Sequence, residues 1–249
     1  MTTNIGFKQI FWQAWRDIVF VHWQVDPLLL SSVLPPALEP DLFEGKAYIG
    51  LVPFRMTDIR SVWLPAIPGT SSTLETNVRT YVKRRCVAHE PIPAVWFFSL
   101  EAQNALAVTL ARLQYGLPYF KASMKLSKES LSGVTTITAA SSRSWPRPIP
   151  ATSLVVAEFS SATEKSSATP GTLEHFLFER YALYALKRDR LTYARVVHSP
   201  YVFAKGTLTQ VDTGLLTAAG LLPLHGAQNA LVHQADDVKV RIGAPYYVS

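Results

Sequence analysis

The chain has few of the residues on which metal sites and covalent cross-links depend. Cys86 is its only cysteine among 249 residues, so an intrachain disulfide and a multi-cysteine zinc site are excluded. Cys86 follows the basic run Lys83-Arg84-Arg85, and we expect a reduced thiol there. An inert structural cysteine and a nucleophile activated by the positive charge both fit this position.

Familiar cofactor and nucleophile motifs are also missing. The six histidines include no pair at helical ligand spacing and no His-Glu-x-x-His motif, so we expect no metal. Glycine-rich phosphate loops and a Gly-x-Ser-x-Gly elbow are absent too, and nothing indicates an organic cofactor. We interpret Glu174-His175 as a pair at a helix start, where the glutamate favours the helix dipole.

The charge and hydrophobicity of the chain limit the classes of partner that it is expected to bind. The formal charge of +6 favours weak attraction to anions, but the basic residues are scattered and form no nucleic-acid-binding motif. The run at 83–85 suits a solvated strand end better than a phosphate-binding patch. No apolar stretch reaches the length of a membrane span, and residues 1–4 do not resemble a signal peptide. We therefore expect a soluble, cytoplasmic protein without nucleic-acid or membrane partners, and leave open a homo-oligomer.

With 48% hydrophobic and 17% charged residues, the chain can bury a sizeable core, as one large β-rich domain or two small ones. Period-two patterns predict many strands that regular helices do not separate. This favours an α+β class, mostly antiparallel β with a few helices. Strands are predicted at 18–25, 47–56, 74–82, 95–100, 121–126, 134–139, 154–160, 192–198, 204–211 and 237–242.

Helices are predicted at 27–34, 104–115 and 173–186, with a short one at 215–221. The first has the clearest boundaries, because Asp26-Pro27 suits a helix start and Pro35-Pro36 ends it. Residues 7–17 suit a short amphipathic helix or an extended arm, with Phe11, Trp12 and Trp15 inward. Residues 57–72 read as a long loop of the kind that often forms a lid.

The strand at 74–82 is the most informative segment. Its alternation places four polar side chains on one face, opposite Leu74, Thr76, Val78, Thr80 and Val82. If the polar face looks at water, this is an ordinary surface strand. If the polar face looks into a barrel or cleft, it is a binding site for a small polar molecule. The four polar residues are Glu75, Asn77, Arg79 and Tyr81.

These residues suggest a division of roles. Arg79 would hold an anionic ligand, while Glu75 and His22 would move protons. Asn77 and Tyr81 would orient the ligand, Gln24 shares a strand face with His22, and Arg55 ends a third strand. A structural Arg–Glu pair, with His22 hydrogen-bonded to the backbone, explains the same residues equally well.

Five stretches resemble the bacterial YqjF-like family, which is grouped with the acetoacetate decarboxylase-like superfamily. They are residues 22–27 (HWQVDP), 52–56 (VPFRM), 75–82 (ETNVRTYV), 97–100 (FFSL) and 173–181 (LEHFLFERY). The resemblance covers nearly the whole chain. It implies one β-barrel-like domain over 1–249 that encloses a pocket.

The same resemblance implies which residues of the decarboxylase site have counterparts in this chain. A decarboxylase pocket arginine falls at Gln24 and a pocket glutamate near Glu75. The decarboxylases then have a lysine pair that supplies the Schiff base, where this chain has Leu117-Pro118, with Lys121 a few residues away. We therefore predict no acetoacetate decarboxylase activity and no Schiff base.

Three functions remain open at this point. The first is a protein that binds a small oxo or carboxylate compound, with lyase, hydratase or isomerase-type acid–base chemistry. The second is a non-catalytic ligand-binding or sensing protein that kept the pocket. The third is a scaffold with a filled barrel.

Overall fold

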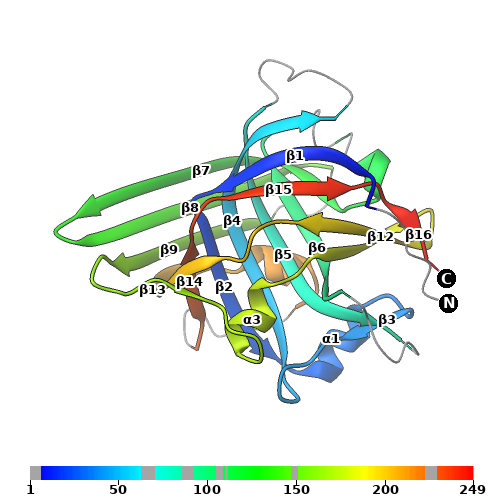
Figure 1. Cartoon of the computed structure of the whole chain (residues 1–249), viewed down its shortest axis with the longest axis horizontal. Helices are drawn as coiled ribbons and strands as arrows, with labels where there is room; N and C mark the ends of the chain where they lie inside the picture. The colour runs from blue at the N-terminus through cyan, green and yellow to red at the C-terminus, as the bar shows by residue number, and fades with distance from the viewer. Residues whose placement is uncertain are drawn as a thin grey trace.

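The computed structural model describes residues 7–62, 71–85, 92–104, 109, 112–146, 151–221 and 229–248 (Figure 1). Its helices are α1 (Pro27–Val33), α3 (Leu173–Phe178) and α4 (Gly214–Ala218). None of the helices in these ranges is long and apolar enough to cross a membrane. The strands are β1 (Gln9–Arg16), β2 (Ile18–Val25), β3 (Leu38–Pro40), β4 (Ala47–Ser61), β5 (Thr73–Arg84), β6 (Ala94–Ala102), β7 (Tyr119–Leu131), β8 (Val134–Trp145), β9 (Thr152–Ser160), β10 (Ser166–Ser167), β11 (Ala182–Lys187), β12 (Arg190–Val197), β13 (Val202–Asp212), β14 (Leu231–Ala235), β15 (Val238–Gly243) and β16 (Tyr246–Tyr247).

The strands form one mixed sheet that closes on itself twice. Its pairings are antiparallel except where β6 pairs with β7 and β11. One closed circuit runs β1-β15-β12-β11-β6-β5-β4 and back to β1, and we call it the cavity ring. The other runs β6-β7-β8-β9-β13-β14-β2-β4-β5 and back to β6, and we call it the second ring. The mostly antiparallel, barrel-like fold predicted from the sequence is confirmed, although the barrel is irregular.

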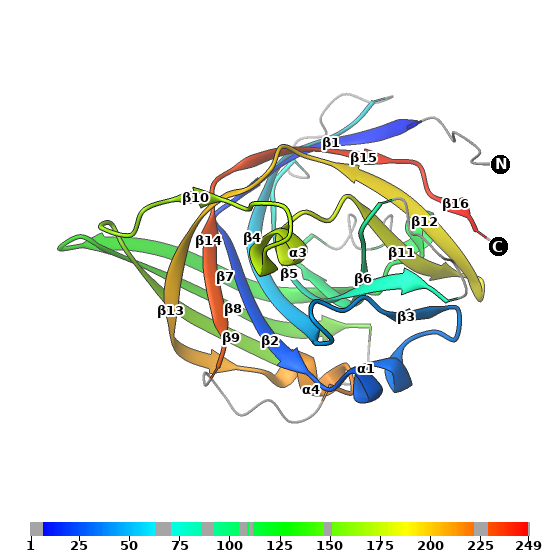
Figure 2. The same cartoon turned by 60° about the horizontal axis from the view of Figure 1, so that its bottom comes forward.

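Strand β4 makes the double closure possible. Its first half pairs with β2 and its second half pairs with β1, so one long strand serves both rings. Figure 2 shows β1, β15 and β12 arching over α3, while the β7–β8 hairpin extends away from the rest. The strands predicted at 121–126 and 134–139 are confirmed as parts of β7 and β8, which form this hairpin. Ser132 and Gly133 both have positive φ, as a two-residue type I′ turn requires.

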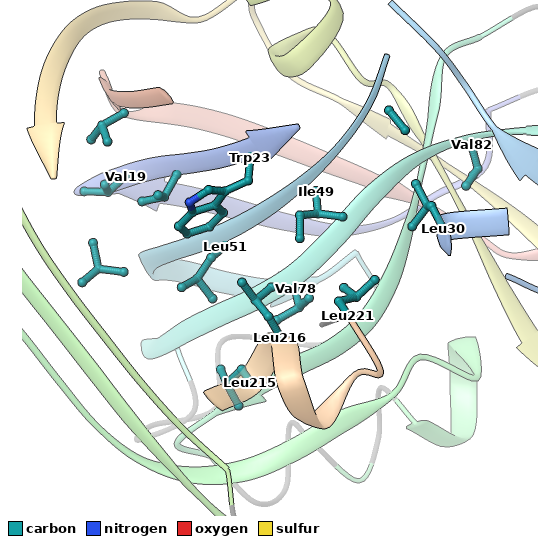
Figure 3. Close-up of a cluster of buried hydrophobic side chains, with 14 of the residues drawn as sticks. Val19, Trp23, Leu30, Ile49, Leu51, Val78, Val82, Leu215, Leu216 and Leu221 are labelled. Atoms are coloured by element: carbon teal, nitrogen blue, oxygen red, sulfur yellow. The ribbon is translucent and has the colours of Figure 1, made fainter. Parts of the chain in front are cut away.

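Strand β5 separates two hydrophobic cores. Val78 and Val82 face the second ring, where they join a cluster with Trp23, Leu215 and Leu216 (Figure 3). The opposite face of β5 looks into the cavity ring, whose core contains Tyr81 and many other aromatic side chains. Residues 73–82 are all buried, so β5 is covered on both faces. The polar face therefore does not look at water.

Two local predictions were wrong. Residues 182–187 are strand β11, not the second half of a helix, although alanine and leucine favour helices. The helix ends early because the backbone of Glu179 leaves helical geometry and its carboxylate accepts a hydrogen bond from the backbone N–H of Tyr201 at 3.0 Å. Pairing with β12 and β6 then outweighs the local propensity.

The N-terminal segment was also predicted only in part. Residues 9–16 form a strand, β1, so the alternative of a helix at 7–17 was wrong. Phe11 and Trp15 point inward as expected, but Trp12 lies on the outer face and is 37% exposed. The predicted helix at 27–34 is confirmed as α1, capped by Asp26. Residues 112–115 are helical, while 105–108, 110 and 111 of the predicted helix at 104–115 lie outside the described residues.

Candidate ligand-binding site

The cavity ring encloses a cavity of about 450 Å³. Most side chains that line it are apolar or aromatic, including Phe20, Phe54, Val95, Phe97 and Leu183. Its volume lies within the range of about 300–1,000 Å³ that is typical of small-molecule sites. The polar side chains of β5 enter this apolar space as a single strip.

Glu75, Asn77 and Arg79 all line the cavity. The alternation of β5 places them on one face, and the register with β4 sets them opposite Phe54, Val52 and Gly50. All three are buried, with 3%, 5% and 8% of their surface exposed. The sequence therefore predicted that these three side chains share one strand face, while their role remains a proposal.

Arg79 is a buried cation whose hydrogen bonds are incomplete. One terminal nitrogen donates to the backbone carbonyl of Leu177 at 3.1 Å, whereas Nε has no partner in the part of the chain that the structure describes. No carboxylate of these residues lies within ion-pair distance of it. The guanidinium carbon lies 5.1 Å from the ring centre of Phe20 and 5.7 Å from that of Tyr81, and these aromatic faces partly offset the charge. A buried charge without a partner costs several kcal/mol, so the arrangement favours an anion in the cavity.

The carboxyl of Glu75 is buried and hydrogen-bonded. Burial raises the pKa of its carboxyl to about 7, although hydrogen bonds from Tyr119 and Asn77 oppose the rise. The Tyr119 hydroxyl donates to the Glu75 carboxylate at 2.8 Å. A pKa near 7 lets Glu75 both accept and release a proton at neutral pH, which is what general acid–base catalysis needs.

Asn77 adds an unused acceptor to the strip. Its amide nitrogen contributes to the hydrogen bonding of Glu75, and Oδ1 is buried without a partner among the described residues. A ligand hydroxyl or amine can meet this oxygen. The strip therefore offers three functions in order: a carboxyl near its pKa, a free carbonyl and a free guanidinium N–H.

His22 and Tyr81 form a support beneath this strip. Neither side chain lines the cavity; they bond to each other, with His22 Nε2 and the Tyr81 oxygen 2.7 Å apart. The Tyr81 hydroxyl also lies 3.0 Å from the Leu177 carbonyl, and in the arrangement where it donates there, His22 donates from Nε2. Burial, together with the charges of Arg79 and His233, holds the pKa of His22 well below its usual range. His22 is therefore neutral at neutral pH and suits positioning better than proton transfer.

Gly50 makes room for this support. A Cβ atom there would lie 3.0 Å from Cδ2 of His22 and 3.5 Å from Cγ of Arg79. The absence of a Cβ at Gly50 thus leaves space for both side chains beside β4, and this residue of β4 helps to set the position of the Arg79 guanidinium.

Arg180 is the second buried arginine on the cavity wall, but its hydrogen bonds are used. It donates to the Asp41 carboxylate at 2.6 Å and to the Phe176 carbonyl at 2.6 Å. Its guanidinium also lies over the Phe176 ring. It therefore fixes α3 against the loop at residue 41 and leaves Arg79 as the buried cation available to a ligand.

Three residues considered at the sequence level lie outside the cavity lining. Gln24 is exposed near the end of β2, where the strand passes beyond the core. Arg55 lies on the outer face of β4, because Phe54 and Met56 take the inward positions, and it pairs with Asp17 at 3.2 Å. Lys121 is exposed on β7. Cys86 and residues 63–70 of the predicted loop at 57–72 lie outside the described residues. The loop prediction was wrong for residues 57–61, which continue strand β4 and pair with β1.

Sequence reasoning missed Tyr119 and Arg180. Tyr119 follows the predicted helix at 104–115, and nothing local shows that it reaches β5. Arg180 lay inside the predicted helix at 173–186. Within the described ranges, no group of three or more histidine, cysteine or acidic residues could hold a metal ion.

The fold is similar to that of acetoacetate decarboxylase-like proteins of known structure. It resembles the enduracididine biosynthesis enzyme MppR complexed with pyruvate (TM-score 0.64, 16% identity, covering 100% of this chain and 93% of that one). An acetoacetate decarboxylase-like enzyme from Sphingomonas wittichii RW1 is similar (TM-score 0.60, 14% identity, 98% and 94% covered). So is acetoacetate decarboxylase from Legionella pneumophila (TM-score 0.58, 13% identity, 100% and 92% covered).

Sequence comparison then identifies the family. Residues 12–239 match the model of the DUF2071 family, described as "Uncharacterized conserved protein". The chain is also 35% identical over 202 residues to "Uncharacterized protein YqjF" of Bacillus subtilis (strain 168), covering 80% of this chain and 78% of that protein. The chain belongs to this YqjF-like DUF2071 family, as the resemblance predicted.

The raised pKa of Glu75 predicts a specific pH dependence of stability. Its usual pKa of 4.5 applies in the unfolded chain and about 7 in the folded one. Burying the carboxyl therefore costs nothing below pH 4.5, costs more as pH rises towards 7, and costs up to about 3 kcal/mol above 7. Relative to the native chain, Glu75→Gln should gain about that much unfolding free energy between pH 4 and pH 8.

Urea unfolding of both proteins at the two pH values measures this difference, in which other titrating groups cancel. Glu158→Gln on the exposed face of β9 is the matched control and should show no such change. Parallel pH profiles for the native chain and Glu75→Gln would contradict a raised pKa.

Proposed function

We propose that this protein binds a small oxo carboxylate in the cavity ring and moves a proton on it through Glu75. The observation that carries the proposal is the buried guanidinium of Arg79, which has no carboxylate partner among the described residues and whose Nε is unsatisfied; it shares a cavity wall with a carboxyl whose pKa is about 7. The fold neighbour described with pyruvate supports an oxo acid as the class of ligand.

Each residue of the strip has a role in this proposal. Arg79 donates hydrogen bonds to the ligand carboxylate, and Asn77 Oδ1 accepts one from a ligand donor. Ionised Glu75 takes a proton from the carbon next to the ligand carbonyl, so the C–H bond breaks, a Glu75 O–H bond forms and the electron pair stays on the ligand as an enolate. Returning the proton reverses the step. Lyase and hydratase reactions of oxo acids both use this transfer.

Schiff-base chemistry is not part of the proposal. No lysine is among the described residues that line the cavity, and Lys121 is exposed. A Schiff base needs an amine whose charge is suppressed by burial or by a cationic neighbour. Leu117 and Pro118, at the position of the decarboxylase lysine pair, cannot supply it.

Deuterium exchange tests the proposed step. The protein should speed the exchange of the methyl protons of pyruvate in D₂O, followed by proton NMR, and Glu75→Gln should remove at least 100-fold of that acceleration. Glu158→Gln should retain it. The same incubation with borohydride should leave the chain without an adduct by mass spectrometry; an adduct on Lys121 would contradict the proposal.

A non-catalytic binding or sensing protein is the second candidate, and the missing lysine favours it. In that case the chain binds the oxo acid but does not speed deuterium exchange above the rate in solvent alone. Glu75→Gln then changes neither the binding nor the exchange rate. The third candidate, a filled barrel, does not account for a cavity of about 450 Å³.

A further inference from the structure

Resting on the proposed function, we infer that the ligand is a monocarboxylate with a long apolar tail rather than a three- or four-carbon acid. Three features of the cavity carry this inference: its size, the single buried cation with a free donor among the described residues that line it, and the position of its unsatisfied polar atoms. Figure 1 shows the strands involved: β4, β5 and β6 form one wall, and β12 and β15 belong to the opposite side of the ring.

The cavity is too large for a short acid. With about 30 Å³ for each water-sized group, a volume of about 450 Å³ holds on the order of 15 non-hydrogen atoms. A ligand of pyruvate size would leave more than half of that space without contacts. Because the remaining lining is mostly apolar, such a space would be poorly occupied by water.

Arg79 limits the ligand to one buried carboxylate. Arg180 already donates to Asp41 and to the Phe176 carbonyl, and Arg60 lines the cavity from an exposed position on β4. A second anionic group at depth would therefore meet no free cation among the described residues. It would also be repelled by Glu75 whenever that carboxyl is ionised.

Among the described residues that line the cavity, the buried polar side-chain atoms without a hydrogen-bond partner belong to Asn77 and Arg79, both on β5. The backbones of Glu75 and Arg79 are roughly 13 Å apart along β5, so both side chains must extend towards each other to reach one oxo acid group. Phe97 on β6 is the cross-strand neighbour of Arg79, and Leu183, Val196, Ile242 and Ile10 line the rest of the ring from β11, β12, β15 and β1. An alkyl or aromatic tail would bury its surface against these side chains.

A chain-length series tests the inference on the unmodified protein. Isothermal titration at pH 7.5 would compare pyruvate with the 2-oxo acids of four, six, eight and ten carbons, and with the alkanoates of matching length. Each buried methylene should tighten binding about fourfold, equivalent to about 0.8 kcal/mol, until the cavity is full. Straight-chain amides of the same lengths should bind at least 100-fold more weakly than the acids, because they carry no charge for Arg79.

A cavity-filling variant locates the tail. Leu183→Trp should weaken binding of the eight-carbon acid at least tenfold and leave pyruvate binding unchanged. Leu186→Trp is the matched control on the same strand, because Leu186 is 38% exposed and does not line the cavity. It should bind both acids as the native chain does.

The outcomes separate this inference from the proposed function. If pyruvate binds and longer acids bind no better, the tail is disproved and the proposed function stands. If amides bind as tightly as acids, the carboxylate contact is disproved. If alkanoates gain affinity with length as the 2-oxo acids do, and bind equally well, the tailed carboxylate is supported and the oxo group is not required. If no acid of any length binds, both proposals fail.

Discussion

Replacing Arg79 by methionine is expected to weaken the binding of a carboxylate ligand by at least 100-fold. Removing one partner of a buried, hydrogen-bonded charge pair typically costs about 2–5 kcal/mol of binding free energy. Methionine keeps much of the side-chain volume beside Phe20 and Tyr81 while removing the charge and every donor. Titration of the native and variant proteins with the best-binding acid of the series measures the effect.

The unfolding free energy should respond in the opposite sense. Arg79 has no carboxylate partner among the described residues, so its loss leaves no buried anion behind. In the absence of ligand, Arg79→Met should therefore be as stable as the native chain or more stable. Arg60→Met is the matched control, because Arg60 lines the same cavity from an exposed position. It should change neither property by more than about 1 kcal/mol.

A structural role for Arg79 would give a different pattern. The variant would then unfold at lower urea concentration in the absence of ligand, and acid binding would fall only in proportion to the folded fraction. Equal losses of affinity in Arg79→Met and Arg60→Met would indicate general attraction to positive charge, and would contradict a specific guanidinium contact.

The sequence predicted the strip on β5 because alternation is a local signal. Burial of one face with Val78 and Val82 requires a core, and the polar face then points to the opposite side at a fixed period. Nothing local indicates that this second side is also enclosed. That depends on β4 pairing with both β1 and β2, a long-range arrangement that only the family resemblance made predictable.

Other parts of the site depend on contacts between distant segments. Tyr119 meets Glu75 across 44 residues, and Arg180 meets Asp41 across 139. The sequence predicted the strand faces of His22 and Tyr81 correctly. It did not predict their mutual hydrogen bond, in which both side chains lie outside the cavity lining. Strand β11 was predicted as helix because its alanine and leucine residues carry a helical preference that sheet pairing overrides.

The second large effect is expected at a buried ion pair on the other side of β6. Arg143 donates from Nε at 3.0 Å and from a terminal nitrogen at 2.6 Å to the same Glu101 oxygen, while Ser99 donates to the other oxygen at 3.1 Å. The two side chains are 7% and 0% exposed. Arg143→Met should lower the unfolding free energy at pH 7.5 by about 3–5 kcal/mol, because it leaves a buried carboxylate without its cation.

The matched control is Arg55→Met, which removes one of the two cations beside Asp17, in a partly exposed pair, and should cost no more than about 1 kcal/mol. The double variant Arg143→Met with Glu101→Gln should recover most of the loss, since glutamine can still accept from Ser99 and carries no charge.

Burial already raises the pKa of Glu101 and Arg143 opposes the rise, so removing the arginine raises the pKa further. The penalty of Arg143→Met should therefore shrink as pH falls from 7.5 towards 4.5, because the raised pKa of Glu101 lets the carboxyl take up a proton in the folded variant within this range. A loss that is independent of pH, or that the double variant fails to recover, would mean that Arg143 stabilises the fold through packing on Phe120 rather than through its charge.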